Sequence, residues 1–158
     1  MFREITRKNK QLSLEECIHL LTQIPRGVLS LIGDEGYPYG VPLNYWYNPQ
    51  DGNLYFHSGN SGHKVDAIRK CSKASFCIMD SGYREDGDWA LNIKSVIVFG
   101  KIRLVEDAEK AIEITRSLSY KYTSDTAFIE GEISKYSDGL LVFALEPEHI
   151  CGKLVKES

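Results

Sequence analysis

The sequence has no hydrophobic run that approaches the roughly 20 residues needed to span a bilayer, so no membrane helix is expected. It also has no excess of positive charge, because 19 Lys and Arg stand against 22 Asp and Glu, for a net charge of −3. A protein that binds nucleic acid without regard to sequence is usually basic. We therefore expect neither a membrane nor a nucleic acid as partner. The hydrophobic share of 42% excludes a disordered chain.

Paired cysteines of the kind that bind zinc or exchange disulfides are missing as well. The four cysteines, Cys17, Cys71, Cys77 and Cys151, include no C-x-x-C spacing, and no metal site is expected. Residues 1–11 are too polar for a secretory signal. Together these features predict a reduced, cytoplasmic protein.

The length of 158 residues suits one domain over 1–158. Ser13 and Glu16 form the pattern of a capping box, which predicts a helix start. Further helices are expected over 63–71 and 108–118, and strands over 28–32, 39–47, 54–57, 74–79, 91–105, 140–145 and 150–155. Residues 120–137 fit no clear pattern. Tight turns between most strands favour antiparallel pairing, so we expect a mainly β (α+β) fold with six or seven strands in a closed or nearly closed barrel and helices at the periphery.

Two strands contain residues that break a regular ladder. Pro42 removes one backbone donor, which predicts an edge, a bulge or an exposed backbone stretch there. Gly100 predicts a bend in the long strand 91–105. By itself, the segment 94–101 has no functional signature.

The segment 54–64 has the features of an anion site. A strand ends, a small polar loop follows, and a helix begins near His63 and Lys64. Free N–H groups at a helix start carry partial positive charge and favour phosphate. The alternative is that Ser61 and its neighbours cap the helix while Lys64 is solvated. The segment 40–47, with Pro42 and Asn44, can bind a planar heterocycle or can be an aromatic-rich core strand.

Taken in order, these segments resemble the flavin-binding split barrel of the pyridoxamine 5'-phosphate oxidase-like superfamily, and especially the 5-nitroimidazole-resistance proteins. The likeness rests on 36–45, 54–58, 62–64 and 95–101, with 150–153 similar to the final strand. It implies a homodimer with FMN, or FAD, at the subunit interface. The residues that match cofactor-binding positions are Val41, Pro42, Leu43, Asn44, Tyr45, Phe56, His57, Ser58, His63, Lys64, Ser95 and Val96.

The resemblance implies a flavin-dependent oxidoreductase that reduces a small acceptor such as a nitroaromatic ring. His57 is the candidate catalytic residue, to orient or protonate the acceptor; the alternative is a strand histidine bonded to a backbone carbonyl. A non-catalytic flavin- or haem-binding protein is the alternative function. Gly40 and Tyr45 replace basic residues of the vitamin-forming oxidases, whose carboxyl-terminal Arg and His motif is also missing, so oxidation of pyridoxine phosphate is not expected. Because His63 replaces an arginine, flavin affinity should fall as His63 loses its proton.

Overall fold

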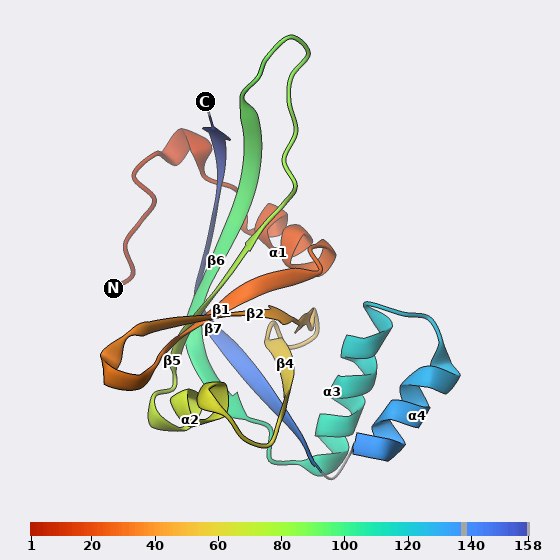
Figure 1. The fold of residues 1–158 in the computed structure, drawn as a ribbon. Helices are drawn as coiled ribbons and strands as arrows, with labels where there is room; N and C mark the ends of the chain where they lie inside the picture. Colours follow the sequence, from red (N-terminus) through yellow and green to blue (C-terminus); the bar gives the residue numbers. More distant parts are fainter. Residues whose placement is uncertain (137–138, 158) are drawn as a thin grey trace.

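The computed structural model describes residues 1–136 and 139–157, and within them seven strands form one antiparallel sheet (Figure 1). The strands are β1 (Arg26–Ile32), β2 (Pro38–Asn44), β3 (Trp46–Tyr47), β4 (Leu54–Gly59), β5 (Lys73–Met79), β6 (Leu91–Leu104) and β7 (Leu140–Glu157). The helices are η1 (Lys8–Lys10), α1 (Leu14–Gln23), η2 (Asp34–Gly36), α2 (His63–Lys70), α3 (Ala108–Tyr120) and α4 (Thr126–Tyr136).

The sheet curls into a barrel that is split between its first and last strands. Its order is β2-β1-β5-β6-β7-β4-β3, so β2 and β3 form the two edges although only Tyr45 separates them in sequence. A single residue therefore connects the two edge strands of the sheet. The expected antiparallel barrel with six or seven strands and peripheral helices is confirmed, and the split follows from this edge-to-edge link.

The longest ladder joins β6 to β7 and contains the bend expected at Gly100. The register shifts between Phe99 and Gly100, and a Cβ at Gly100 would lie 2.1 Å from the carbonyl oxygen of Glu146. Only glycine fits so close an approach. The expectation of separate strands over 140–145 and 150–155 is wrong, because this bulge lets β7 continue as one strand through both.

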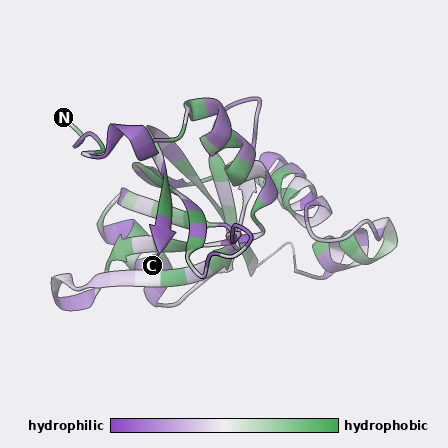
Figure 2. Cartoon of the chain, turned by 90° about the horizontal axis from the view of Figure 1, so that it is seen from above, coloured by the Kyte–Doolittle hydropathy of each residue, from purple (hydrophilic) through white to green (hydrophobic). Residues whose placement is uncertain are grey.

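Alternation along the strands builds the core. Large side chains such as Leu29, Phe76 and Leu145 are fully buried inside the curled sheet. Helix α1 lies against the barrel through Cys17 and Leu21, and hydrophobic and hydrophilic residues alternate along the helices (Figure 2). The predicted capping box at the start of α1 is present.

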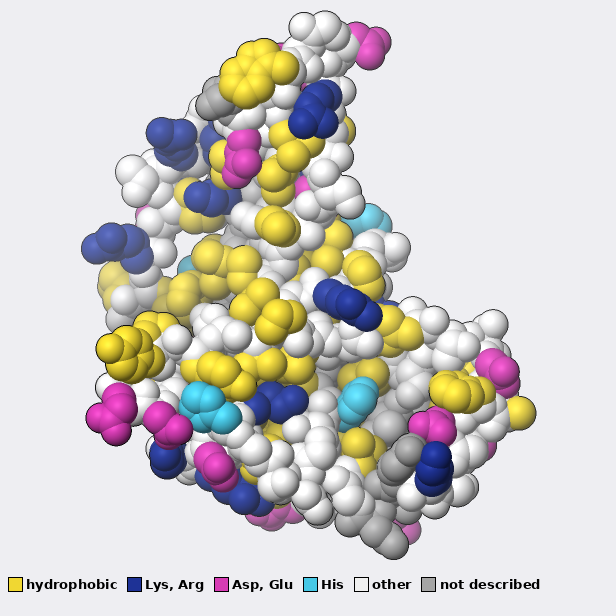
Figure 3. All heavy atoms as spheres, in the orientation of Figure 1, with side chains coloured by type: hydrophobic (Ala, Val, Ile, Leu, Met, Phe, Trp, Pro, Cys, Tyr) yellow, Lys and Arg dark blue, Asp and Glu magenta, His cyan; other side chains and the backbone are white. Residues whose placement is uncertain are grey.

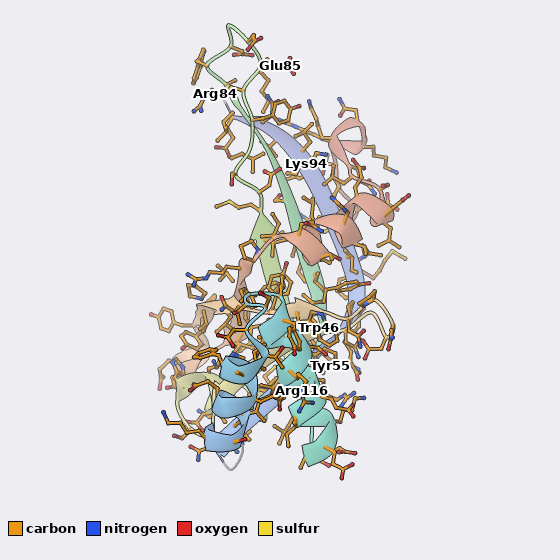
Figure 4. The ribbon with its side chains drawn as sticks, turned by 90° about the vertical axis from the view of Figure 1, so that its right-hand side faces the viewer. Trp46, Tyr55, Arg84, Glu85, Lys94 and Arg116 are labelled. Carbon is orange, nitrogen blue, oxygen red and sulfur yellow. The ribbon has the colours of Figure 1, made fainter. Side chains whose placement is uncertain are left out.

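Helix α4 lies in the stretch that no sequence pattern assigned, of which residue 137 is outside the described residues. Gly131 lies inside α4, and glycine lowers helix propensity. The helix is held against α3 by the ion pair of Arg116 with Glu130. Figure 4 shows Arg116 on α3 and, beside this helix, Trp46 and Tyr55, whose rings stack with centroids 5.8 Å apart. Among the described helices, none is long and apolar enough to cross a membrane.

Candidate functional site

Among the described residues, the split leaves the outer edges of β2 and β3 without a neighbouring strand, and part of β4 as well. β2 has one such edge because it ends the sheet, and β4 has one over residues 56–59 because β3 pairs only with Leu54 and Tyr55. Pro42 lies in β2, so the edge position expected for it is confirmed. Strand edges of this kind present backbone N–H and C=O groups to a ligand. The segments 41–44 and 56–58, expected to bind one cofactor, are the segments that border the split.

A hollow of about 310 Å³ lies at the split. It is lined by Arg26, Pro42, Leu43, Asn44 and His57, so it combines residues of β1, β2 and β4. Arg26 donates from Nε to Oδ1 of Asn44 at 3.0 Å, which fixes the orientation of that amide. The sequence interpretation missed Arg26. Counting outward from the turn at 33–37 pairs Arg26 with Asn44 and could have found it.

Lys64 lies in the first turn of α2 and has no partner. Its side chain is half-buried, yet no described residue forms a hydrogen bond or ion pair with it. Burial lowers the pKa of its ammonium group because desolvation disfavours the charged form. Partial burial sets Lys64 apart from a freely solvated surface lysine, and it has no counter-ion among the described residues.

The helix start beside Lys64 is also uncapped. The N-cap position is Gly62, with φ +118°, and no side chain accepts a hydrogen bond from the first turn. Capping by Ser61 is thus not found. An uncapped first turn retains free N–H donors, and together with an unpaired lysine they form an arrangement that suits an anion.

His63 is engaged by its neighbours in a way that Lys64 is not. Its ring stacks on Tyr39 with centroids 4.0 Å apart, and its Nε2 accepts a hydrogen bond from the backbone N–H of Asp34 at 3.3 Å. The carboxylate of Asp34, 3.6 Å from Nε2, also pairs with Lys70. Of the expected basic pair, only Lys64 offers an unengaged cation.

His57 borders the hollow and reaches the surface. It forms no hydrogen bond with any described residue, so the alternative of a carbonyl-bonded strand histidine is not found. Crowding by neighbouring atoms lowers the pKa of its imidazole by desolvation, and the charge of Lys64 lowers it further. His57 is therefore a neutral imidazole at neutral pH, with one nitrogen to donate and one to accept. In Figure 3, histidine and Lys or Arg side chains lie close together among hydrophobic ones in the lower half of the molecule.

Several expected cofactor residues turn their side chains into the core. Tyr45 and Val96 have none of their surface exposed, Phe56 has 2% and Ser58 has 9%. Strand alternation explains this, because the neighbours of an outward residue point inward. Contact from Tyr45, Phe56 and Val96 to a ligand is thus left to their backbones, while Asn44 and His57 line the hollow together with Leu43, whose side chain also packs against the core.

Ser95 lies elsewhere, on the outer face of the sheet. Register places it opposite Met79 and Lys153, so it is about three strand spacings, or ~14 Å along the sheet, from Asn44. It lines a second hollow of about 530 Å³, between β6 and β7 and the N-terminal segment. Within one chain, Ser95 and the hollow at the split do not meet.

This arrangement has a known counterpart in sequence. A family model described as pyridoxamine 5'-phosphate oxidase matches residues 13–154. The chain belongs to the pyridoxamine 5'-phosphate oxidase-like family of flavin-binding split barrels. No protein in the curated set matches the sequence. The expected family is confirmed, and the match covers every strand of the sheet except the last three residues of β7.

Solved structures share the same split barrel. A candidate 5-nitroimidazole antibiotic resistance protein from Bacteroides thetaiotaomicron is 18% identical with a TM-score of 0.78, over 99% of this chain and 98% of that one. An FAD-binding protein from Mesorhizobium loti is 24% identical with a TM-score of 0.66, over 92% and 97%. An FAD and haem binding protein from Mycobacterium smegmatis is 19% identical with a TM-score of 0.73, over 92% and 73%. At these identities the likeness establishes the fold alone.

Proposed function

We propose that this split-barrel protein is a flavin-dependent oxidoreductase that holds FMN at the split and reduces a small acceptor such as a nitroaromatic compound. FAD is the alternative cofactor, because its adenylate half could extend outside the hollow. The observation that carries the proposal is Lys64, a half-buried cation in an uncapped helix turn that has no counter-ion among the described residues. Family membership and the flavin-binding proteins of the same fold support it.

The donor set at the split fits a flavin. Lys64 and the free N–H groups of the first turn of α2 would bind the phosphate, since a cation and a helix start both favour an anion. The amide of Asn44, oriented by Arg26, and the free edges of β2 and β4 would bind the polar rim of the ring. Leu43 would supply an apolar surface. When bound, the flavin supplies two-electron redox chemistry, while the chain supplies placement and electrostatics.

His57 is proposed to orient the acceptor. Its imidazole borders the hollow, is neutral at neutral pH, and has no partner among the described residues. A neutral imidazole donates a hydrogen bond from one nitrogen and accepts one at the other. Orientation of a polar acceptor group is therefore its main role at neutral pH, because the lowered pKa leaves little imidazolium to act as an acid.

A homodimer is part of the proposal. One row of apolar side chains crosses the outer face of five neighbouring strands: Pro42, Val28, Cys77, Ile97 and Cys151. Val28 is 39% exposed and Met79 is 67% exposed, and Figure 3 shows hydrophobic side chains over the middle of this face. Exposed apolar patches mark interaction surfaces. A second copy on this face would also bring its own Ser95 toward the split, which one chain alone does not do.

One observation favours the alternative of haem binding. Nε2 of His149 is buried without a hydrogen-bond partner, and its ring stacks on Phe2 with centroids 5.0 Å apart. An unpartnered imidazole nitrogen can serve as an axial ligand. This alternative needs Phe2 to move aside, whereas the flavin proposal needs no such movement. All four cysteines are free, which supports a reducing, cytoplasmic setting for either function.

The visible spectrum of the purified protein after incubation with FMN, FAD or haem tests the proposal. Flavin absorption that stays with the protein through gel filtration supports it, and bleaching of that absorption by a nicotinamide donor, followed by recovery with a nitroaromatic acceptor, supports turnover. A Soret band with no retained flavin would instead favour haem, and its loss in His149→Ala would identify the ligand. A retained flavin that no donor reduces would favour a carrier over an enzyme.

A further inference from the structure

The turn that follows α3 contacts Tyr45, the single residue that joins the edge strands β2 and β3. The hydroxyl of Tyr122 accepts a hydrogen bond from the backbone N–H of Tyr45 at 2.9 Å. It also lies 2.9 Å from the carbonyl oxygen of Tyr45 and within hydrogen-bond distance of the carbonyl of Pro25. One hydroxyl has one proton, so it donates to these two carbonyls in alternation while it continues to accept from Tyr45.

Lys121, the neighbour of Tyr122, also contacts Tyr45. Its Nζ lies 3.6 Å from the ring centroid of Tyr45 and donates to the carbonyl of Ile24 at 2.8 Å. The side chain is half-buried and forms no ion pair with any described carboxylate. Its burial lowers the pKa of the ammonium group to about 8. The ammonium group is therefore held by the ring faces of Tyr45 and, 5.9 Å away, Tyr122, and by one carbonyl.

Tyr45 is fixed from the inside as well. Its ring is fully buried, and its hydroxyl donates to the carbonyl of Leu21 at 2.8 Å. Residues from the end of α1, from the turn after α3 and from the sheet edge thus converge on one residue. The residue immediately before Tyr45 is Asn44, whose amide lies in the hollow at the split.

We propose that Tyr122 and Lys121 are positioning residues of the flavin site, which act by fixing Tyr45 and through it the segment Leu43–Asn44 at the ring. The inference rests on the proposed function. Neither residue lines the hollow, so the role assigned to them is an indirect one. Without the Tyr122 hydroxyl, the N–H of Tyr45 loses its acceptor, and the link is free to shift.

The test compares Tyr122→Phe with Tyr120→Phe. The control removes a hydroxyl from the same end of α3, but that hydroxyl contacts only Thr126 among the described residues. FMN affinity is measured by quenching of flavin fluorescence, and the visible spectrum of bound FMN is recorded at saturation. We expect Tyr122→Phe to weaken FMN about fivefold, which corresponds to one net hydrogen bond, and to shift the flavin absorption band. The control should leave both unchanged.

A purely structural role would lower the melting temperature of Tyr122→Phe but leave the affinity and the band of the folded fraction unchanged, and that result overturns the inference. If Tyr122→Phe does not fold, Lys121→Met replaces it, with the same two measurements and Lys121→Arg as the charge-preserving rescue. Wild-type protein that retains neither FMN nor FAD would overturn the proposed function together with this inference. Wild-type binding with unchanged variants would overturn the inference alone.

Discussion

Replacing Lys64 with Met should weaken FMN binding and at the same time stabilise the flavin-free protein. A hydrogen bond to a charged group contributes about 1.5–3 kcal/mol, which corresponds to about a 10- to 150-fold loss of affinity. Lys64 has no other partner among the described residues, so the loss falls on the ligand. Methionine keeps most of the buried stem, which separates the effect of charge from that of packing.

The stability of the flavin-free protein should change in the opposite direction. Burial lowers the pKa of Lys64 in the folded state below its unfolded value. A base with a lowered pKa destabilises the fold when it is charged in both states, that is, below the folded pKa, and this cost disappears as pH rises toward the unfolded pKa. At pH 7 the charge therefore opposes folding. Lys64→Met should melt at or above the wild-type temperature without flavin.

The assay compares FMN with riboflavin, which lacks the phosphate. Wild type should bind FMN more tightly than riboflavin, and Lys64→Met should reduce that preference while riboflavin affinity changes little. Arg69→Met is the matched control, because Arg69 is an exposed cation on the same helix. If Lys64→Met keeps the full preference for FMN, the phosphate lies elsewhere and the argument from the unpaired cation is refuted.

Four further results are expected. Ser13→Ala should lower the free energy of unfolding by about 1 kcal/mol, measured in urea, because it removes the cap of α1. Gly100→Ala should destabilise by more than 2 kcal/mol in the same assay, since its Cβ would meet the carbonyl of Glu146, and overpacking of this kind costs about 1–3 kcal/mol or more. The contribution of His57 to acceptor reduction is the difference in rate between wild type and His57→Ala. This difference should not vary with pH above 7 and should change only below the usual imidazole pKa of 6.5, because the pKa of His57 is lowered. Stability in wild type should rise from pH 8 toward 10.5 relative to Lys121→Met, because the folded pKa of Lys121 is about 8 against 10.5 for the free side chain.

Each of these results has a contradicting outcome. Unchanged stability of Ser13→Ala would show that the capping box does not stabilise α1. Full stability of Gly100→Ala would mean that the bulge can open without cost. A difference rate for His57 that falls steeply between pH 7 and 8 would show that its imidazole works as a cation. If the stability of wild type and of Lys121→Met changed in parallel with pH, the pKa of Lys121 would not be lowered by folding.

Local patterns in the sequence predicted most of the fold, because the signals involved are short-range. The capping box at Ser13, the edge position of Pro42 and the bend at Gly100 each follow from the chemistry of one or two residues. Helix α4 was not predicted. It is stabilised by the ion pair of Arg116 with Glu130 and by packing on α3, and its own sequence has no clear helical alternation of hydrophobic residues. The single strand β7 was predicted as two strands over 140–145 and 150–155, whereas in the structure the bulge accommodates Glu148 and Pro147 lies opposite Gly100.

The candidate site was predictable in position more than in detail. The residues alone left 40–47 open between a ring site and a core strand; the family resemblance pointed to 41–45 and 56–58, and residues of both segments line the hollow at the split. Which side chains face outward depends on strand phase, so Tyr45, Phe56 and Val96 were named although their side chains fill the core. Tyr122 carried no signal at all, because its contact with Tyr45 joins residues 77 positions apart.

The long ladder between β6 and β7 has a consequence for how the molecule reaches this shape. It runs from Leu104 opposite Phe143 to Leu91 opposite Glu157, so every rung closes a loop that contains the whole α3–α4 hairpin. Chain entropy opposes each such closure before any apolar contact can compensate. We expect the β6–β7 ladder, which forms the middle of the barrel, to be completed late in folding. Until then, the edges of β6 and β7 that face each other remain open to pairing with the wrong chain.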